Sequence, residues 1–132
     1  MENLTLVGTT PFGVGNELAN LIIGNASANT LLAGAGNDTL DGGAGTDILW
    51  GQEGADTFRI SKATGIDIIA DFQLGTDKLD LSAWGLTSLA QVQAKMRQVG
   101  SDLAIDLDPD NIVIVVGITG SQFAQTDLGP GP

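Results

Sequence analysis

The 132-residue chain contains no cysteine, histidine or tyrosine. The missing cysteines exclude disulfides and thiolate metal sites, and they leave the redox compartment undefined. The missing histidines remove the commonest general base and a common metal ligand. Only five residues are lysine or arginine, against 16 aspartates and glutamates, which gives a formal charge of −11. This balance argues against nucleic-acid or anionic-membrane partners and favours cations.

Long apolar runs are missing as well. No apolar segment approaches the roughly 20 residues that span a bilayer, so we expect no membrane insertion. The N-terminal MENLTLVG lacks a basic region followed by an apolar core. We therefore expect no cleaved signal peptide. The length suits one domain, or a repeat array with a cap.

Glycine is abundant, with 19 residues, and much of it recurs with a period of nine. Asp38, Asp47 and Asp56 each stand two residues after a glycine and two before a bulky apolar side chain. A catalytic group does not recur at a fixed interval, so the pattern predicts a structure that itself repeats. Five units align without gaps: GNELANLII (15–23), GNASANTLL (24–32), AGAGNDTLD (33–41), GGAGTDILW (42–50) and GQEGADTFR (51–59).

The eighth residue of every unit is apolar, which predicts a three-residue strand with its middle side chain buried, after a six-residue turn. A strand this short cannot bury a core alone. Coiling the chain solves the problem, because two units then form one coil of a parallel β-roll with two sheets facing each other. Neighbouring strands are expected 18 residues apart, at about 4.8 Å. The turns 15–20, 33–38 and 51–56 then share one edge, and 24–29 and 42–47 share the other.

This stacking brings Asp38 next to Asp56. Two carboxylates about 5 Å apart repel by nearly 1 kcal/mol in water, and by several-fold more where solvent is partly excluded. A cation between the turns relieves the repulsion, and main-chain carbonyls of glycine-rich turns supply further oxygens. Such an oxygen-rich, flexible site suits Ca²⁺ better than Mg²⁺.

The unit GGAGTDILW fits the pattern G-G-x-G-x-D-x-apolar-x, and the chain resembles the calcium-binding repeats-in-toxin (RTX) parallel β-roll. The resemblance implies a Ca²⁺ site between turns 33–38 and 51–56. Its implied ligands are the carboxylates of Asp38 and Asp56 and the carbonyls of Ala33, Ala35, Gln52 and Gly54. The other implied metal-site residues are Asp47 and the turn residues Gly42, Gly43, Ala44, Gly45, Gly51 and Glu53.

The first two units depart from the family pattern, because Asn20 and Asn29 stand where aspartate is expected. Asparagine is neutral, so stacked amides can hydrogen-bond without a metal. We expect residues 15–32 to be metal-poor, with a weakened site where Asp47 faces Asn29. In the later units Ala33 replaces a first glycine and Gln52 replaces a small residue.

The period is lost after residue 59, so we divide the chain into an entry segment (1–14), the roll (15–59) and a capping region (60–132). Residues 66–86 resemble the segment that commonly follows the last RTX repeats. Asp67 and Asp71 could complete metal sites at the open end, below Asp47 and Asp56 respectively. Solvated carboxylates beside a turn at Gly75 explain them equally well.

The best helix candidate is 88–99, where Ser88 and Gln91 form a capping box and Gly100 can end the helix. Two alternating strands follow within 101–118, joined by a turn at 108–111. The acidic run 106–110 does not fit an EF-hand, because Pro109 is internal and no glutamate closes the loop. We expect an all-β protein: a parallel β-roll, then a β-rich cap with one short helix, with Trp84 against the core and Trp50 exposed.

The leading functional expectation is a calcium-binding module that folds outside the cell, aids type I secretion and stabilises a larger extracellular bacterial protein. The expected partners are calcium ions, an upstream domain and the type I secretion machinery. The C-terminal SQFAQTDL roughly fits the acidic-apolar end of such a secretion signal, but the trailing GPGP does not.

Two other classes remain. A polysaccharide-binding module beside an extracellular enzyme is the alternative, with Trp50 and Arg59 as an outward-facing contact for an alginate-like sugar. A catalytic role is not expected. The carboxylate pairs Asp67/Asp71 and Asp77/Asp80 are candidates only by count, since turn or metal roles explain each pair.

Overall fold

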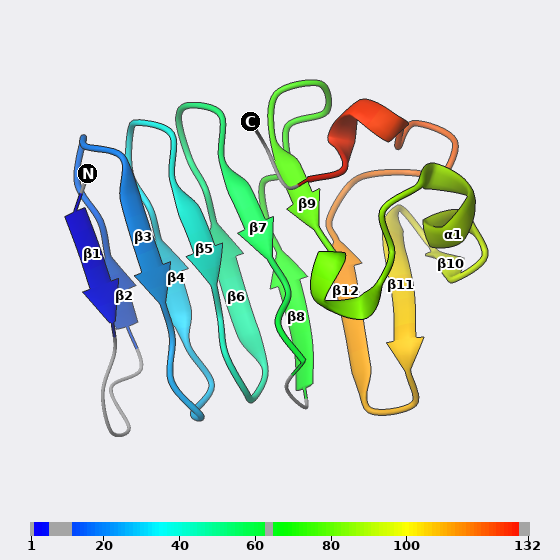
Figure 1. The fold of residues 1–132 in the computed structure, drawn as a ribbon, viewed down its shortest axis with the longest axis horizontal. Coiled ribbons are helices and arrows are strands. Elements are labelled where there is room, and N and C mark those ends of the chain that lie inside the picture. Colours follow the sequence, from blue (N-terminus) through cyan, green and yellow to red (C-terminus); the bar gives the residue numbers. More distant parts are fainter. Residues whose placement is uncertain (1, 6–11, 63–64, 130–132) are drawn as a thin grey trace.

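The computed structural model describes residues 2–5, 12–62 and 65–129. The chain winds as a coil whose strands alternate between two facing sheets, from the N-terminus to the helix α1 at the opposite end (Figure 1). No helix within the described part of the chain is long and apolar enough to cross a membrane.

Within the described ranges, the two sheets contain five and seven strands. The five-stranded sheet has the order β1 (Glu2–Thr5), β3 (Asn20–Ile23), β5 (Thr39–Asp41), β7 (Thr57–Arg59) and β9 (Lys78–Asp80). The seven-stranded sheet has the order β2 (Phe12–Val14), β4 (Thr30–Leu32), β6 (Asp47–Trp50), β8 (Gly65–Ile69), β12 (Asn111–Val115), β11 (Asp102–Asp108) and β10 (Met96–Val99). All pairings are parallel except those of β11 with β10 and β12. The all-β parallel roll is confirmed.

The register within the repeats has the predicted spacing of 18 residues, as in the pairs Leu40↔Phe58 and Leu31↔Leu49. The coil does not stop where the period is lost. Strand β8 pairs with β6 through Ile48↔Ile68, and β9 pairs with β7 through Thr57↔Lys78. Longer turns therefore absorb the extra residues while the parallel stacking continues.

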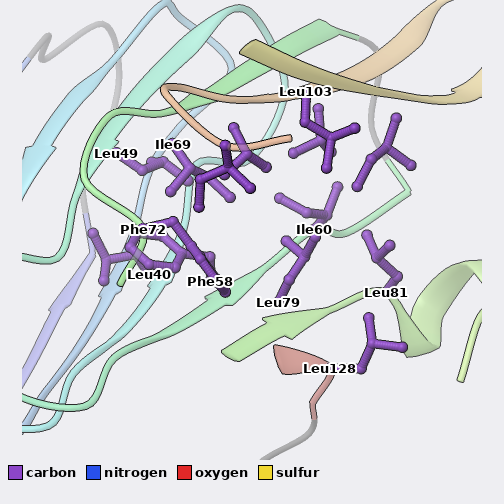
Figure 2. Close-up of a cluster of buried hydrophobic side chains, with 14 of the residues drawn as sticks. Leu40, Leu49, Phe58, Ile60, Ile69, Phe72, Leu79, Leu81, Leu103 and Leu128 are labelled. Carbon is purple, nitrogen blue, oxygen red and sulfur yellow. The ribbon is translucent and has the colours of Figure 1, made fainter. Parts of the chain in front are cut away.

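The apolar residue at the eighth position of each unit forms the core. Ile22, Leu31, Leu40, Leu49 and Phe58 are all fully buried, as predicted. Figure 2 shows Leu40, Leu49 and Phe58 together with Ile69 and Leu79, which continue the stack from β8 and β9. Burying such a side chain contributes roughly 1.5–3 kcal/mol, so the stack stabilises strands too short to persist alone.

The capping region differs from the prediction at its helix. The helix α1 spans Leu89–Gln93, and the capping box of Ser88 and Gln91 is present. The predicted continuation to residue 99 is wrong, because β10 pairs with β11 through Met96↔Ile105 and Val99↔Asp102. Gly100, with φ of 61°, lies in the tight turn of this hairpin rather than at a helix end.

The other cap predictions hold. The hairpin β11–β12 closes through Asp108↔Asn111, and Asp108 Oδ1 accepts the main-chain N of Asp110, so this carboxylate stabilises a turn. Trp50 is 39% exposed, and Trp84, in the 3-10 helix η1 (Ser82–Trp84), packs half-buried against the core. After a second 3-10 helix, η2 (Gln125–Asp127), Leu128 bridges to Leu79 at the end of the five-stranded sheet.

Candidate metal centre

The turns that precede β3, β5, β7 and β9 lie along one edge of the roll, at the top of Figure 1, which we call the first edge. Four buried residues on it form the first-edge ladder: Asn20, Asp38, Asp56 and Asp77. Asp38 Oδ1 accepts the main-chain N of Asn20 at 2.7 Å. Asp56 Oδ1 accepts that of Asp38 at 2.9 Å, and Asp77 Oδ1 accepts that of Asp56 at 2.9 Å. Each carboxylate therefore binds, with one oxygen, the turn that lies one coil earlier on the same edge.

The opposite edge carries the turns that precede β4, β6 and β8, and we call it the second edge. Its ladder consists of Asn29, Asp47 and Asp67. Asp47 Oδ1 accepts the main-chain N of Asn29 at 2.8 Å, and Asp47 lies directly opposite Asp67 in the register of β6 and β8. The prediction that Asp67 lies below Asp47, that is, next to it in the following coil on the same edge, is confirmed.

The second carboxylate oxygens have no such partner. Oδ2 of Asp38, Asp47 and Asp56 and Oδ1 of Asp67 are buried, and no hydrogen bond reaches them from the described residues. An ionised oxygen that is buried without a partner costs several kcal/mol. These atoms must therefore be protonated or meet a cation, and their chemistry fits a hard divalent ion.

The asparagines of the first two units solve the same problem differently. Asn20 Oδ1 accepts the main-chain N of Asn16 at 3.1 Å, and Asn29 Oδ1 accepts that of Asn25 at 2.9 Å. These turns close within themselves. The expectation of hydrogen-bonded starting turns agrees with these two bonds, which run inside each turn.

In the later units the main-chain N–H of the second residue does not donate to the aspartate of its own unit. Gly34 N donates to Gln52 Oε1, Gly43 N to Asp41 Oδ1, and Gln52 N to Asp71 Oδ2. These three residues have φ of 86°, 76° and 64°, in the left-handed region, whereas Asn16 and Asn25 do not. In the aspartate turns, the positive φ of the second residue goes together with a carboxylate oxygen that does not accept that residue's N–H. The asparagine turns and the aspartate turns therefore differ both in sequence and in backbone conformation.

The first residue of a unit lies close to the second carboxylate oxygen, Oδ2, of the aspartate in the same unit. A Cβ built on Gly42 would overlap Asp47 Oδ2, and one built on Gly51 would overlap Asp56 Oδ2. Ala33 holds the equivalent place before Asp38 and is fully buried, so this turn accommodates one methyl group.

Burial raises the pKa values of the ladder carboxylates. Together with neighbouring negative charges it raises the pKa of Asp56 to about 8 and that of Asp67 to about 8. It raises the pKa of Asp47 to about 6, and it raises the pKa values of Asp38 and Asp77 as well. Without a metal, both edges therefore hold protons near neutral pH, and a cation would compete with them.

The implied carbonyl ligands lie where two turns meet. A hollow between turns 33–38 and 51–56 is lined by Gly34, Ala35, Gln52 and Glu53. No three acidic side chains converge within the described ranges. A cation held here by Asp38 and Asp56 would therefore take its other ligands from main-chain oxygens or water. On the second edge, a Cβ built on Gly43 would crowd the carbonyl oxygen of Asn25, and one built on Gly45 would crowd that of Ser27, so turn 42–47 stacks closely on turn 24–29.

The predicted place of Asp71 is wrong. Asp77, not Asp71, lies below Asp56, while Asp71 accepts the main-chain N atoms of Gly51 and Gln52. The longer turn after β8 shifts the ladder position beyond the expected residue. A signal for Asp77 is present in the sequence, because GTDKL (75–79) repeats the glycine-x-aspartate-x-apolar frame, as does GIDII (65–69). The interval had slipped from nine residues to 11 and then 10, so a strict period missed it.

Comparisons with known proteins agree with this geometry. Residues 14–58 match the family model of the RTX calcium-binding nonapeptide repeat, in four copies. Among solved structures, the chain is similar to the solution structure of the AlgE6R3 subunit from the Azotobacter vinelandii mannuronan C5-epimerase. The identity is 26%, the TM-score is 0.53, and the match covers 94% of this chain and 81% of that one. A search of the curated proteins found no match. The repeat segment of this chain thus belongs to the RTX calcium-binding nonapeptide repeats, folded as a parallel β-roll.

Proposed function

We propose that the module binds Ca²⁺ between successive turns and folds as it does so. The observation that carries the proposal is the set of buried carboxylate oxygens, on Asp38, Asp47 and Asp56, that no donor among the described residues reaches. On the first edge, Asp38 and Asp56 would hold the ion together with the carbonyls of turns 33–38 and 51–56. A bound Ca²⁺ supplies positive charge and coordination to oxygens that otherwise need a proton.

On the second edge the better partner for Asp47 is Asp67. Each of the two presents a buried oxygen to which no described residue donates a hydrogen bond, and they lie opposite each other on neighbouring strands. The oxygen of Asn29, in contrast, already accepts an amide of its own turn. The carbonyls of the turn 42–45 would complete the coordination.

Calcium binding would then drive folding. Without a cation, desolvated carboxylates and the backbone entropy of the glycine-rich turns oppose order. With one, the binding free energy adds to the free energy of folding. We propose that the chain stays open at low cytosolic calcium, passes through a type I secretion channel, and folds outside as a stabilising part of a larger extracellular protein. Phe123 and Leu128 are buried in the fold, so a C-terminal export signal would be read before folding.

The test is circular dichroism during a calcium titration. The matched variants are Asp38→Asn with Asp56→Asn, and, as a charge-matched control, Glu17→Gln with Asp110→Asn on exposed positions. We expect β signal to grow with calcium in the unmodified protein and in the control. In the ladder variant this calcium-dependent change should vanish or require at least tenfold more calcium. Equal folding of the unmodified protein in chelator and in millimolar calcium would contradict the proposal.

We further propose that the module has no catalytic activity. The carboxylates available for an acid–base pair have other roles: Asp71 accepts two turn amides, and Asp80 Oδ1 accepts the main-chain N of Ser82. Release of reducing ends from a panel of polysaccharides by the purified calcium-loaded module would overturn this view.

A second candidate function is polysaccharide binding, which the likeness to a subunit of a mannuronan epimerase favours. Trp50 and Arg59 cannot form one contact surface, because they lie on different sheets. Polar side chains instead line a hollow across β5, β7 and β9, where Thr39, Thr57 and Lys78 offer hydroxyl and ammonium groups. Amide resonances of these strands should shift when the calcium-loaded module is titrated with mannuronan oligomers, and unshifted resonances would remove the candidate.

A further inference from the structure

The outer face of the seven-stranded sheet is apolar over most of its width. Alternate residues of each strand point away from the core, and within β2, β4, β6, β8 and β12 none of these outward residues is charged. One outward row crosses all of these strands: Phe12, Thr30, Ile48, Ile68 and Ile114. A second row lies beside it on β2, β4 and β6: Val14, Leu32 and Trp50. We call these two rows the apolar face.

The fold does not require apolar side chains at these positions. The seventh and ninth residues of a repeat unit point outward in both sheets. In the unit 42–50, on the seven-stranded sheet, they are Ile48 and Trp50, whereas in the unit 51–59, on the five-stranded sheet, they are Thr57 and Arg59. Strands of the same geometry thus accept polar outward residues. Packing inside the roll therefore does not explain the apolar face.

The apolar face is also open to solvent. Phe12 and Val14 are 60% and 63% exposed, and Ile48 and Trp50 are 37% and 39% exposed. Soluble proteins seldom expose contiguous apolar surface across several strands unless a partner covers it. The face therefore has the character of an interaction surface.

Charge indicates which partner fits this surface. The chain has a formal charge of −11, so two copies repel each other wherever their acidic residues meet. The apolar face carries no charge, and at its border on β11 Asp106 is paired with Arg97 at 2.9 Å. Two copies related by a two-fold axis can meet here without placing like charges in contact, because an uncharged apolar surface is complementary to itself.

The size of the face suits a reversible contact. Neighbouring strands are about 4.8 Å apart, so the face is about 19 Å wide between its outermost strands, and its two rows lie about 7 Å apart. With the width of the side chains this gives roughly 500 Å² per copy, less than the ~800 Å² per partner of a standard interface. Two such sheets can pack face to face at about 10 Å, as in a β-sandwich.

We propose that the apolar face is a self-association surface, through which two copies of the folded chain form a weak two-fold dimer. The inference uses the fold alone and goes beyond calcium binding.

The test is sedimentation velocity in millimolar calcium, at low and at high micromolar protein concentration. The variant Ile48→Lys places a charge on the apolar face. The matched control Leu21→Lys makes the same kind of change at the seventh position of a unit on the five-stranded sheet. Both variants should give the circular dichroism spectrum of the unmodified chain.

We expect the unmodified chain and Leu21→Lys to change from monomer to dimer as the concentration rises, and Ile48→Lys to stay monomeric. The added lysine lowers the net negative charge, so stronger repulsion between copies cannot explain a loss of the dimer. An unmodified chain that stays monomeric at every concentration would overturn the inference, as would equal dimerisation of Ile48→Lys. Either result would leave the proposed calcium binding standing.

A second measurement needs no substitution. Amide resonances of β4 and β6 should shift with protein concentration, while those of β5 and β7 stay in place. Added sodium chloride should raise the dimer fraction, because salt screens the repulsion between the copies and leaves the apolar contact intact. Shifts at β5 and β7 in place of β4 and β6, or a dimer that dissociates in salt, would overturn the inference.

Discussion

At the scale of single residues, one additional side-chain oxygen distinguishes the aspartate turns from the asparagine turns. Asn29 carries one side-chain oxygen, which accepts an amide of its own turn, whereas Asp47 carries two and leaves Oδ2 open. The amide that would close the aspartate turn is bound by Asp41 instead, because Gly43 adopts a left-handed conformation. A metal-ready turn therefore needs both the carboxylate and a residue that tolerates positive φ.

The glycine at the fourth position of a unit gives a sharp prediction. Gly54 has φ of 102°, and a Cβ there would overlap the carbonyl oxygen of Gly36 in the stacked turn. We expect Gly54→Ala to lower the free energy of unfolding by roughly 2 kcal/mol or more, from backbone strain plus overlap. Urea unfolding in calcium measures the loss.

The control for this prediction is Gly85→Ala. Gly85 has φ of 71°, but a Cβ there would meet no neighbouring atom within 4 Å. Its loss should be limited to strain, about 1 kcal/mol. Similar losses in the two variants would show that close stacking of turns contributes nothing.

At the scale of elements, the C-terminal segment 123–129 fastens the end of the roll. Phe123 packs near Phe72, with ring centroids 5.8 Å apart, and Gly129 N donates to the carbonyl of Leu79. Asp127 accepts the main-chain N atoms of Gly75 and Ala124 at 2.7 and 2.8 Å. The edge strand β9 is thereby covered by a segment about 50 residues later in the chain.

Asp127→Ala should loosen this end. It leaves two main-chain N–H groups without acceptors, which costs roughly 1–3 kcal/mol for each one that stays buried. We expect faster hydrogen exchange at Gly75 and Gly129, and a higher calcium concentration at the folding midpoint. Asp110→Ala is the control and should leave both unchanged. Identical exchange at these two amides in Asp127→Ala and the unmodified protein would refute the fastening role.

The elements also show where sequence reasoning succeeds and fails. The fold of residues 15–59 and the pairing of Asp38 with Asp56 followed from a strict period, because each unit buries the same position. The helix was overextended because Leu89, Val92, Met96 and Val99 have helical spacing, although only Val92 is fully buried among them. Pairing of Met96–Val99 with β11 outweighed that local pattern, and a non-local pairing leaves no periodic signal. Asp77 was missed because longer turns changed the interval.

At the scale of the whole molecule, raised carboxylate pKa values set the response of the metal-free fold to pH. The ordinary pKa of 3.8 rises to about 6 at Asp47 and to about 8 at Asp56 and Asp67. At a pH between the ordinary and the raised pKa values, the folded chain binds more protons than the unfolded chain. Its free energy of unfolding therefore falls as the pH rises from about 4 to about 8.

In chelator, circular dichroism should consequently show a larger folded fraction at pH 5 than at pH 8. In millimolar calcium the ions replace the protons, and the trend should flatten or reverse, because acid then displaces the metal. A folded fraction in chelator that rises steadily between pH 5 and pH 8 would contradict the assignment of buried, unpaired carboxylates.

The 18-residue register makes the size of the module adjustable. Every coil within the repeats offers its successor the same amides and the same buried apolar side chains, as in Leu31↔Leu49 and Leu40↔Phe58. A duplicate of residues 33–50 inserted after residue 50 would meet matching neighbours on both sides. The asparagine turns at the start of the roll and the segment 123–129 that covers its end would both stay unchanged. We expect such an elongated chain to fold and to hold two additional ions, which native mass spectrometry at saturating calcium would reveal.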